Sequence, residues 1–203
     1  MAMTENFKCN KCTCQLPYFL PCEVSLHNTT KDCWVSYRGS VYDLTELCNL
    51  RKGHQGIELI IAYAGKDISH WSYDNAKEHV AFGESINSTV NNRPSWLDDK
   101  YMRGNLTKNA RPCRIINVLT GTEAVILICE EDTVARIQER FLGFNAHGTS
   151  YTWKFEGLPI DTNCTLTENG IVDERERFLE AGLPDDTYIP AILCYYNDDL
   201  TEQ

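Results

Sequence analysis

The chain has 203 residues, and its 42% hydrophobic content is enough for one large folded core or two small ones. Its net charge of −10 is uneven, because residues 105–203 hold 8 Lys and Arg against 17 Asp and Glu. An acidic half argues against nucleic acid and anionic membranes as partners, since both would repel it. A basic protein surface suits it better, although solubility explains the charge equally well.

No stretch approaches 18 consecutive apolar residues, so the sequence predicts no membrane-spanning helix. The first residues, MAMTENFKCNKC, include no apolar signal region. We therefore expect a protein of the cytoplasm, where its ten cysteines stay mostly reduced.

Residues 1–15 form a cysteine-rich tail. Cys9, Cys12 and Cys14 make a C-x-x-C-x-C pattern, and Cys22 follows. Thiolates at this spacing can hold zinc, but no second C-x-x-C or histidine pair lies nearby to complete a structural site. The favoured interpretation is a loose, reduced tail, and metal binding by the four cysteines stays open.

Residues 16–82 have the pattern of a small α+β domain. The sequence DCWVSYRGSVYDLT at 32–45 predicts two short strands around a turn that contains Gly39, followed by a helix. Pro21 suits the start of an earlier short helix. After the glycine-containing break at 51–56, four apolar residues at helical spacing predict an amphipathic helix: Ile57, Ile60, Ile61 and Ala64. Residues 74–80 predict one more helix.

Three motifs in this domain carry a resemblance to a known family. They are P-x-E-V-x-x-H-N at 21–28, D-C-W-V-x-x-x-G-x-V-Y-D-L-T at 32–45 and A-G-x-D at 64–67. In this order they resemble the cytochrome b5-like heme-binding fold. The resemblance implies two pairs of short helices on a small sheet, with heme held between the pairs by two histidines.

The same resemblance points to His54 and His79 as the cofactor-binding and metal ligands. His54 occupies the place of the family's H-P-G-G turn, and His79 lies 25 residues further on. Two imidazoles would saturate the heme iron and favour one-electron transfer over oxygen chemistry. The apolar wall of the heme pocket would come from five residues of this domain: Ile57, Ile60, Ile61, Val80 and Phe82.

Two alternatives remain open at this site. His70 is a rival for the second ligand, or a core or surface histidine. The turn at His54 reads His-Gln-Gly, without the family's proline and one of its glycines. Because some relatives of the fold bind no heme, a domain that keeps the fold without the cofactor is the competing hypothesis. His27 is interpreted as structural.

Residues 83–111 are polar and lack periodicity, which is typical of a linker. Trp96 and Tyr101 interrupt this segment, and large aromatic side chains need burial. Packing between the two domains is the favoured explanation, and an anchor on a partner protein is the alternative.

Residues 112–203 predict a second α+β domain. The order is a strand at 113–119, a turn at Gly121, a strand at 123–129, a helix capped by Asp132 or Thr133, a strand at 151–155 and a last strand at 189–196. This order resembles ubiquitin-like β-grasp domains, with a charged insertion at 172–188. The resemblance implies a docking module. No nucleophile–base pair appears, so we expect no enzyme.

The two domains in this order, with R-I-I-N-x-L-T at 114–120 and S-Y-T-W-K-x-E-G at 150–157, resemble a family of ciliary proteins that carry a cytochrome b5 domain. That resemblance implies a place in the cilium or flagellum, on the axoneme near the radial spokes, and a role in ciliary beating. Axonemal proteins associated with the spokes or the doublets are then the expected partners, with no nucleic acid and no membrane.

Overall fold

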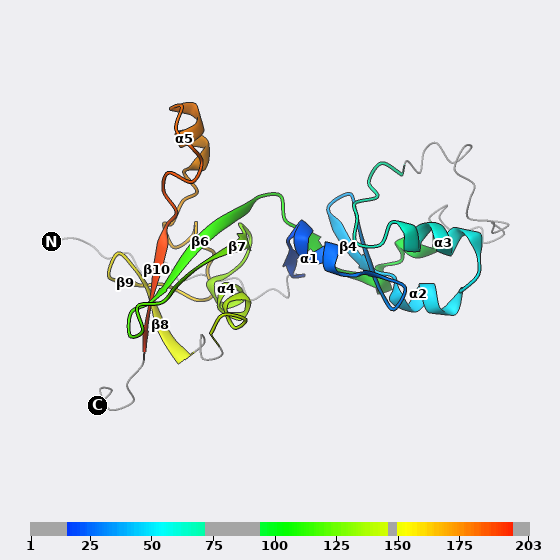
Figure 1. Ribbon diagram of the computed structural model, residues 1–203, viewed down its shortest axis with the longest axis horizontal. Coiled ribbons are helices and arrows are strands. Elements are labelled where there is room, and N and C mark those ends of the chain that lie inside the picture. Colours follow the sequence, from blue (N-terminus) through cyan, green and yellow to red (C-terminus); the bar gives the residue numbers. More distant parts are fainter. Residues whose placement is uncertain (1–15, 72–93, 146–149, 197–203) are drawn as a thin grey trace. The chain divides into compact units, whose positions relative to one another are not determined.

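The computed structural model describes residues 16–71, 94–145 and 150–196 (Figure 1). The chain divides between Lys108 and Asn109 into two compact units. Residues 109–111 of the predicted linker therefore belong to the second unit, and residues 94–108 to the first. The physical reason is burial, because Trp96 and Tyr101 both lie in the core of that unit, 4% and 6% exposed.

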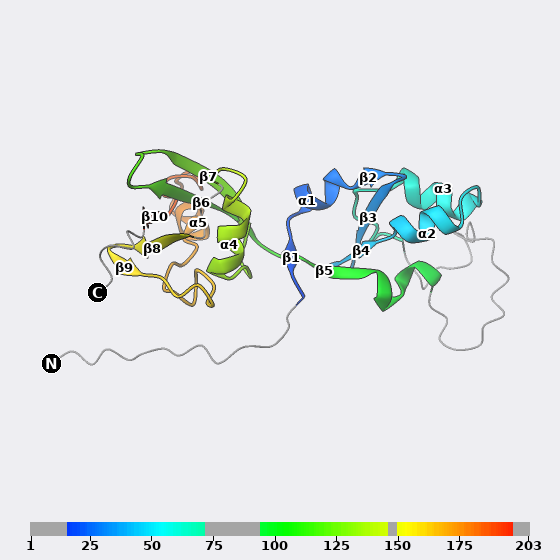
Figure 2. The same ribbon diagram turned by 90° about the horizontal axis from the view of Figure 1, so that it is seen from below.

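The first unit is built on a sheet with the strand order β1-β5-β4-β3-β2. Neighbouring strands are antiparallel except β1 and β5, which are parallel and lie side by side in Figure 2. Its elements are β1 (Tyr18–Phe19), α1 (Pro21–Leu26), β2 (Asn28–Thr29), β3 (Asp32–Tyr37), β4 (Ser40–Asp43), α2 (Thr45–Leu50), α3 (Gln55–Ala62), the 3₁₀ turns η1 (Ser95–Leu97) and η2 (Asp99–Tyr101), and β5 (Met102–Leu106).

The hairpin of β3 and β4 is the element that the sequence predicted best. Its two turn residues, Arg38 and Gly39, have φ values of 48° and 81°. Two consecutive left-handed residues match the right-handed twist of the flanking strands, which explains the glycine in this turn. Strand β3 sends Cys33, Val35 and Tyr37 into the core.

Helices α2 and α3 pack their apolar sides into this same core. Leu47 and Cys48 of α2 are buried, as are Ile57 and Ile60 of α3. The spacing that predicted an amphipathic helix is thus confirmed. The helix itself ends at Ala62, and Ala64 is buried just beyond it.

Strand β5 lies between β1 and β4, and it approaches β1 closely at Gly104. A Cβ atom on this glycine would stand 2.2 Å from the carbonyl oxygen of Pro17 and 2.7 Å from the ring of Phe19. Only glycine allows this approach. The pairing of β4 with β5 also shifts register between Val41 and Tyr42, as a β-bulge does.

The second unit is a sheet with the strand order β7-β6-β10-β8-β9. The central pair, β6 and β10, is parallel, and the other pairs are antiparallel. Its elements are β6 (Ala110–Asn117), β7 (Glu123–Cys129), α4 (Val134–Phe141), β8 (Tyr151–Phe155), β9 (Leu158–Pro159), α5 (Arg175–Glu180) and β10 (Ala191–Tyr196).

Helix α4 covers one face of this sheet. Its N-cap is Thr133, whose side chain accepts a hydrogen bond from the Arg136 amide. Thr133 is one of the two residues that the sequence predicted for this cap. Ile137 and Phe141 pack with Ile115 and Trp153 in a second core, separate from the first. The predicted strands at 123–129 and 151–155 are present with the predicted ends, whereas those at 113–119 and 189–196 span 110–117 and 191–196.

The charged insertion at 172–188 contains a short helix, α5, that projects from the sheet (Figure 1). Its base is fixed by Arg175, which pairs with Asp173 at 2.6 Å and donates to the Ala110 carbonyl at 2.9 Å. These bonds hold the pKa of Asp173 at about 2, because a carboxylate that accepts hydrogen bonds from a guanidinium resists protonation. The charged insertion is therefore anchored to β6.

No helix in the described ranges is long and apolar enough to cross a lipid bilayer.

We expect Gly104→Ala to destabilise the first unit by about 1–3 kcal/mol, because the added methyl group overlaps the backbone of Pro17. Chemical denaturation of the full chain, followed by the signals of the buried tryptophans, measures the change. Gly143→Ala is the control, since its Cβ would meet nothing closer than 4.0 Å. A Gly104→Ala chain as stable as the parent would contradict the close approach.

Candidate functional site

His54 stands at the junction of α2 and α3, where the sequence placed the first ligand. It is the N-cap residue of α3, and its backbone carbonyl accepts hydrogen bonds from the amides of Ile57 and Glu58 at 3.0 and 3.2 Å. Its imidazole caps nothing and is exposed. The backbone of this residue therefore serves the helix, while the ring stays available for a ligand.

The residues next to His54 divide into a core side and an open side. Ile57 and Ile60 are buried in the first core, and Ile61 is only partly buried against it. The other predicted wall residues, Val80 and Phe82, and the predicted ligand His79 lie outside the described residues. The structure thus describes one of the two expected ligands together with one wall of the expected pocket.

His70, the rival ligand, is exposed in the turn that follows α3. Its ring lies 5.7 Å from the ring of Tyr63 and 6.3 Å from that of Trp71, measured between centroids. Within the described residues, His70 and His54 share no ring contact, hydrogen bond or ion pair. The structure therefore does not bring these two candidates together.

The A-G-x-D motif attaches the segment that carries His70 to strand β3. The amide of Gly65 donates to Trp34 at 2.7 Å, and the amide of Ile68 donates to Ser36 at 2.8 Å. Asp67 closes the contact, since its carboxylate accepts the Ser36 hydroxyl at 2.8 Å. The same carboxylate accepts both the amide and the hydroxyl of Ser69. This motif is structural: it holds the chain against the sheet.

His27 occupies a structural position, consistent with its interpretation. Its ring stacks on Trp34 with centroids 3.8 Å apart, and its Nδ1 lies 2.7 Å from the Asp32 carboxylate. Both of the nearby partners come from the start of β3. His27 therefore joins the end of α1 to the sheet.

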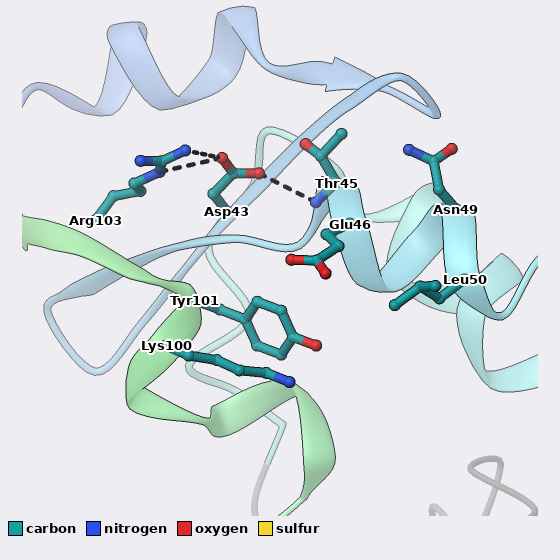
Figure 3. Close-up of a pocket in the computed structure, with 8 residues that line it drawn as sticks. All are labelled: Asp43, Thr45, Glu46, Asn49, Leu50, Lys100, Tyr101 and Arg103. Carbon is teal, nitrogen blue, oxygen red and sulfur yellow. Dashed lines mark hydrogen bonds and ion pairs between the residues drawn. The ribbon is translucent and has the colours of Figure 1, made fainter.

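A polar cleft lies on the first unit, between α2 and the segment that leads into β5 (Figure 3). The side chains of Tyr101 and Lys100 project toward α2 from one wall, and the Lys100 ammonium lies 4.5 Å from the Tyr101 ring centroid. Its lining comprises Asp43, Thr45, Glu46, Asn49, Leu50, Lys100, Tyr101 and Arg103. Neither His54 nor His70, the two candidate histidines that the structure describes, lines this cleft.

The charges of the cleft are partly paired within it. Arg103 donates to the Asp43 carboxylate from two nitrogens, at 2.8 and 3.1 Å, and the Thr45 amide donates to the same group. Burial raises the pKa of Asp43, but these hydrogen bonds outweigh it and leave the pKa below its usual value. Sequence reasoning missed this cleft, because Lys100 and Arg103 fell in the predicted linker. Of the cleft residues in that linker, only Tyr101 was predicted to be buried.

The structure does not assemble a metal site from the cysteines it describes. Cys22 is exposed, and its possible fellow ligands Cys9, Cys12 and Cys14 lie outside the described residues. Across residues 16–71, 94–145 and 150–196, no group of three His, Cys, Asp or Glu side chains is placed to hold a metal ion.

Comparison with known proteins defines the class first. Residues 21–92 match the model of the cytochrome b5-like heme/steroid binding domain. Among solved structures, a cytochrome b558 of Ectothiorhodospira vacuolata, a prokaryotic homologue of cytochrome b5, is 28% identical. It matches 45% of this chain and 100% of its own length, with a TM-score of 0.32.

The particular family follows from relatives that match nearly the whole chain. Cytochrome b5 domain-containing protein 1 of Xenopus laevis is 42% identical, over 91% of this chain and 96% of the relative. The Homo sapiens protein of that name is 37% identical, over 93% of each. The chain belongs to the cytochrome b5 domain-containing protein 1 family, as the motifs of both halves indicated.

We expect Asp67→Ala to free the segment around His70 and to cost about 1–3 kcal/mol, because it leaves the buried Ser36 hydroxyl without its acceptor. Amide hydrogen exchange checks this, through faster exchange of the Ile68 amide. Asp67→Asn keeps one acceptor oxygen and should have a smaller effect. Unchanged exchange at Ile68 in the alanine variant would refute the role given to Asp67.

Proposed function

We propose that this protein is an axoneme-associated ciliary protein whose cytochrome b5-like unit binds heme as a redox or sensing module. In this proposal it is docked near the radial spokes and supports ciliary motility. The observation that carries the heme assignment is the exposed imidazole of His54, which stands uncommitted at the start of α3 in a domain of heme-binding type. The ciliary location is supported by the resemblance of both halves to a family associated with motile cilia.

His54 and His79 are the proposed axial ligands, and His70 is the alternative for the second. The fit of the first ligand rests on donor chemistry, since an exposed ring nitrogen without a capping role can bind iron. Heme held by two imidazoles would supply one-electron transfer or redox sensing. The residues of this chain provide the rest: α3 orients His54 through its first turn, and the isoleucines of α3 form an apolar wall.

The second unit is proposed to be a ubiquitin-like β-grasp domain that serves for docking. Its strand order, with a parallel pair at the centre and one helix between the second and third strands, supports this assignment. No catalytic role is proposed for either unit. The partners are axonemal proteins of the spokes or doublets, and the location is cytoplasm and axoneme.

A heme-free structural adaptor is the competing function. It is favoured by the sequence around His54, where α3 already begins at Gln55 in place of the family's proline–glycine turn. In that case the first unit would contribute only its fold, and docking through the second unit would be the whole function.

An absorption spectrum of the purified full chain, titrated with heme, decides between the two. We expect one equivalent of heme to bind and to give a reducible bis-imidazole spectrum, because two histidines saturate the iron. His54→Ala and His79→Ala should each abolish that spectrum, while Lys52→Ala, an exposed change in the same loop as His54, should leave it intact.

The remaining outcomes are also informative. Loss of the spectrum in His70→Ala but not in His79→Ala would transfer the second ligand to His70. Failure of the parent chain to take up a stoichiometric amount of heme would refute the heme-binding function and leave the adaptor.

Docking is tested in ciliated cells that express tagged chains. We expect the parent chain to stay on isolated axonemes after a salt wash, and a chain without residues 109–203 to be released, because the second unit carries the docking surface. A chain that carries Gly143→Ala controls for handling and tagging. Retention of the truncated chain would exclude docking through the second unit.

A further inference from the structure

One face of the second sheet is left open in the described part of the unit. Along β6, Cys113 and Ile115 point into the core, while Pro112, Arg114 and Ile116 alternate to the other side. Helix α4 packs with the inward set. We call the second side the outer face; Val125 and Leu127 of β7 are 50% and 46% exposed there.

Arg114 lies at the centre of this outer face. Strand pairing places it opposite Val125 of β7 on one side and Ala191 of β10 on the other. The residues two positions away on its own strand are Pro112 and Ile116. The four nearest positions on the outer face are thus all apolar, and the nearest charged position is Glu123 of β7, opposite Ile116 and diagonal to Arg114.

This cation has no anionic partner among the described residues. No carboxylate pairs with the side chain of Arg114, and its Nε is shielded from solvent without a hydrogen-bond partner. Lys154, one strand beyond Leu193, is the other cation of the outer face, and its ammonium lies 4.8 Å from the Tyr195 ring centroid. The strands of the outer face therefore carry two cations, Arg114 and Lys154, against one carboxylate, Glu123 of β7, in a half of the chain whose net charge is −9.

We propose that the outer face is a docking site for a protein segment in which a carboxylate is flanked by apolar side chains. The carboxylate would accept two hydrogen bonds from the guanidinium of Arg114, and the flanking side chains would cover Val125, Leu127 and Ile116. An arginine that becomes desolvated at the centre of an apolar contact is a common source of binding energy. The site deepens the docking role proposed above and rests on it.

Charge complementarity argues for this occupant over a second copy of the chain. A net charge of −10 per chain makes self-association unfavourable, and the outer face carries the same cations in both copies. Nucleic acid is disfavoured by the negative charge of the surrounding unit. A segment with one carboxylate between apolar side chains adds little charge to this acidic unit, and it satisfies both the unpaired guanidinium of Arg114 and the hydrophobicity of the face.

The test is a selection of short random peptides, displayed on phage, against the purified full chain, followed by titration of the enriched peptides. We expect enrichment of sequences in which Asp or Glu lies between apolar residues. Replacing that acid by its amide should weaken binding about tenfold or more, since a charge-assisted bond is lost. Arg114→Gln should remove the preference for the acid.

Two further variants make the result specific. Val125→Glu should weaken every enriched peptide by placing a like charge on the outer face. Arg177→Gln, an exposed change on α5, should leave binding unchanged. The site is refuted by a lack of enrichment, by acid-free sequences, by equal binding to Arg114→Gln, or by dimerisation through this face. Such a failure with axonemal retention intact would remove this site but not the docking role.

Discussion

The architecture of the first unit depends on the insertion of β5 between β1 and β4. This strand comes from residues 102–106, beyond the segment that matches the cytochrome b5-like model, and it joins the entry strand to the central hairpin. The insertion is possible because Gly104 has no side chain where the backbone of Pro17 passes. It also brings Trp96 and Tyr101 into the core, where the Trp96 ring makes edge contacts with the rings of Tyr37 and Tyr42.

Local signals predicted most of the elements, and long-range pairing was not predictable from them. The hairpin of β3 and β4, the isoleucine spacing of α3 and the hydroxyl cap of α4 each depend on residues within one or two turns. The place of β5 depends on a contact between positions almost ninety residues apart, which leaves no periodicity in the sequence. The same holds for the candidate functional residues. His54 could be located from its motif, whereas Arg103 pairs with Asp43 across 60 residues of sequence, and no local pattern predicts such a contact.

The two units differ in the side chain that each leaves available to a ligand. In the first, helix formation uses the backbone of His54 and leaves its ring exposed. In the second, the alternation of β6 places Arg114 on the side away from α4, while Cys113 and Ile115 enter the core. In both units, a side chain able to bind a ligand is held by regular secondary structure. Rigid support of this kind lowers the entropy that a ligand must offset on binding.

The free cysteines give each unit its own internal reporter. Cys33 and Cys48 are buried in the first core, and Cys113 and Cys194 in the second. Burial raises the pKa of Cys113 and of Cys194 to about 12, so neither is a reactive thiolate while its unit stays closed. Alkylating reagents would therefore react with these sulfurs only during transient opening. Mass spectrometry of the labelled peptides would then measure the rate of transient opening of each unit separately, without any mutation of the chain.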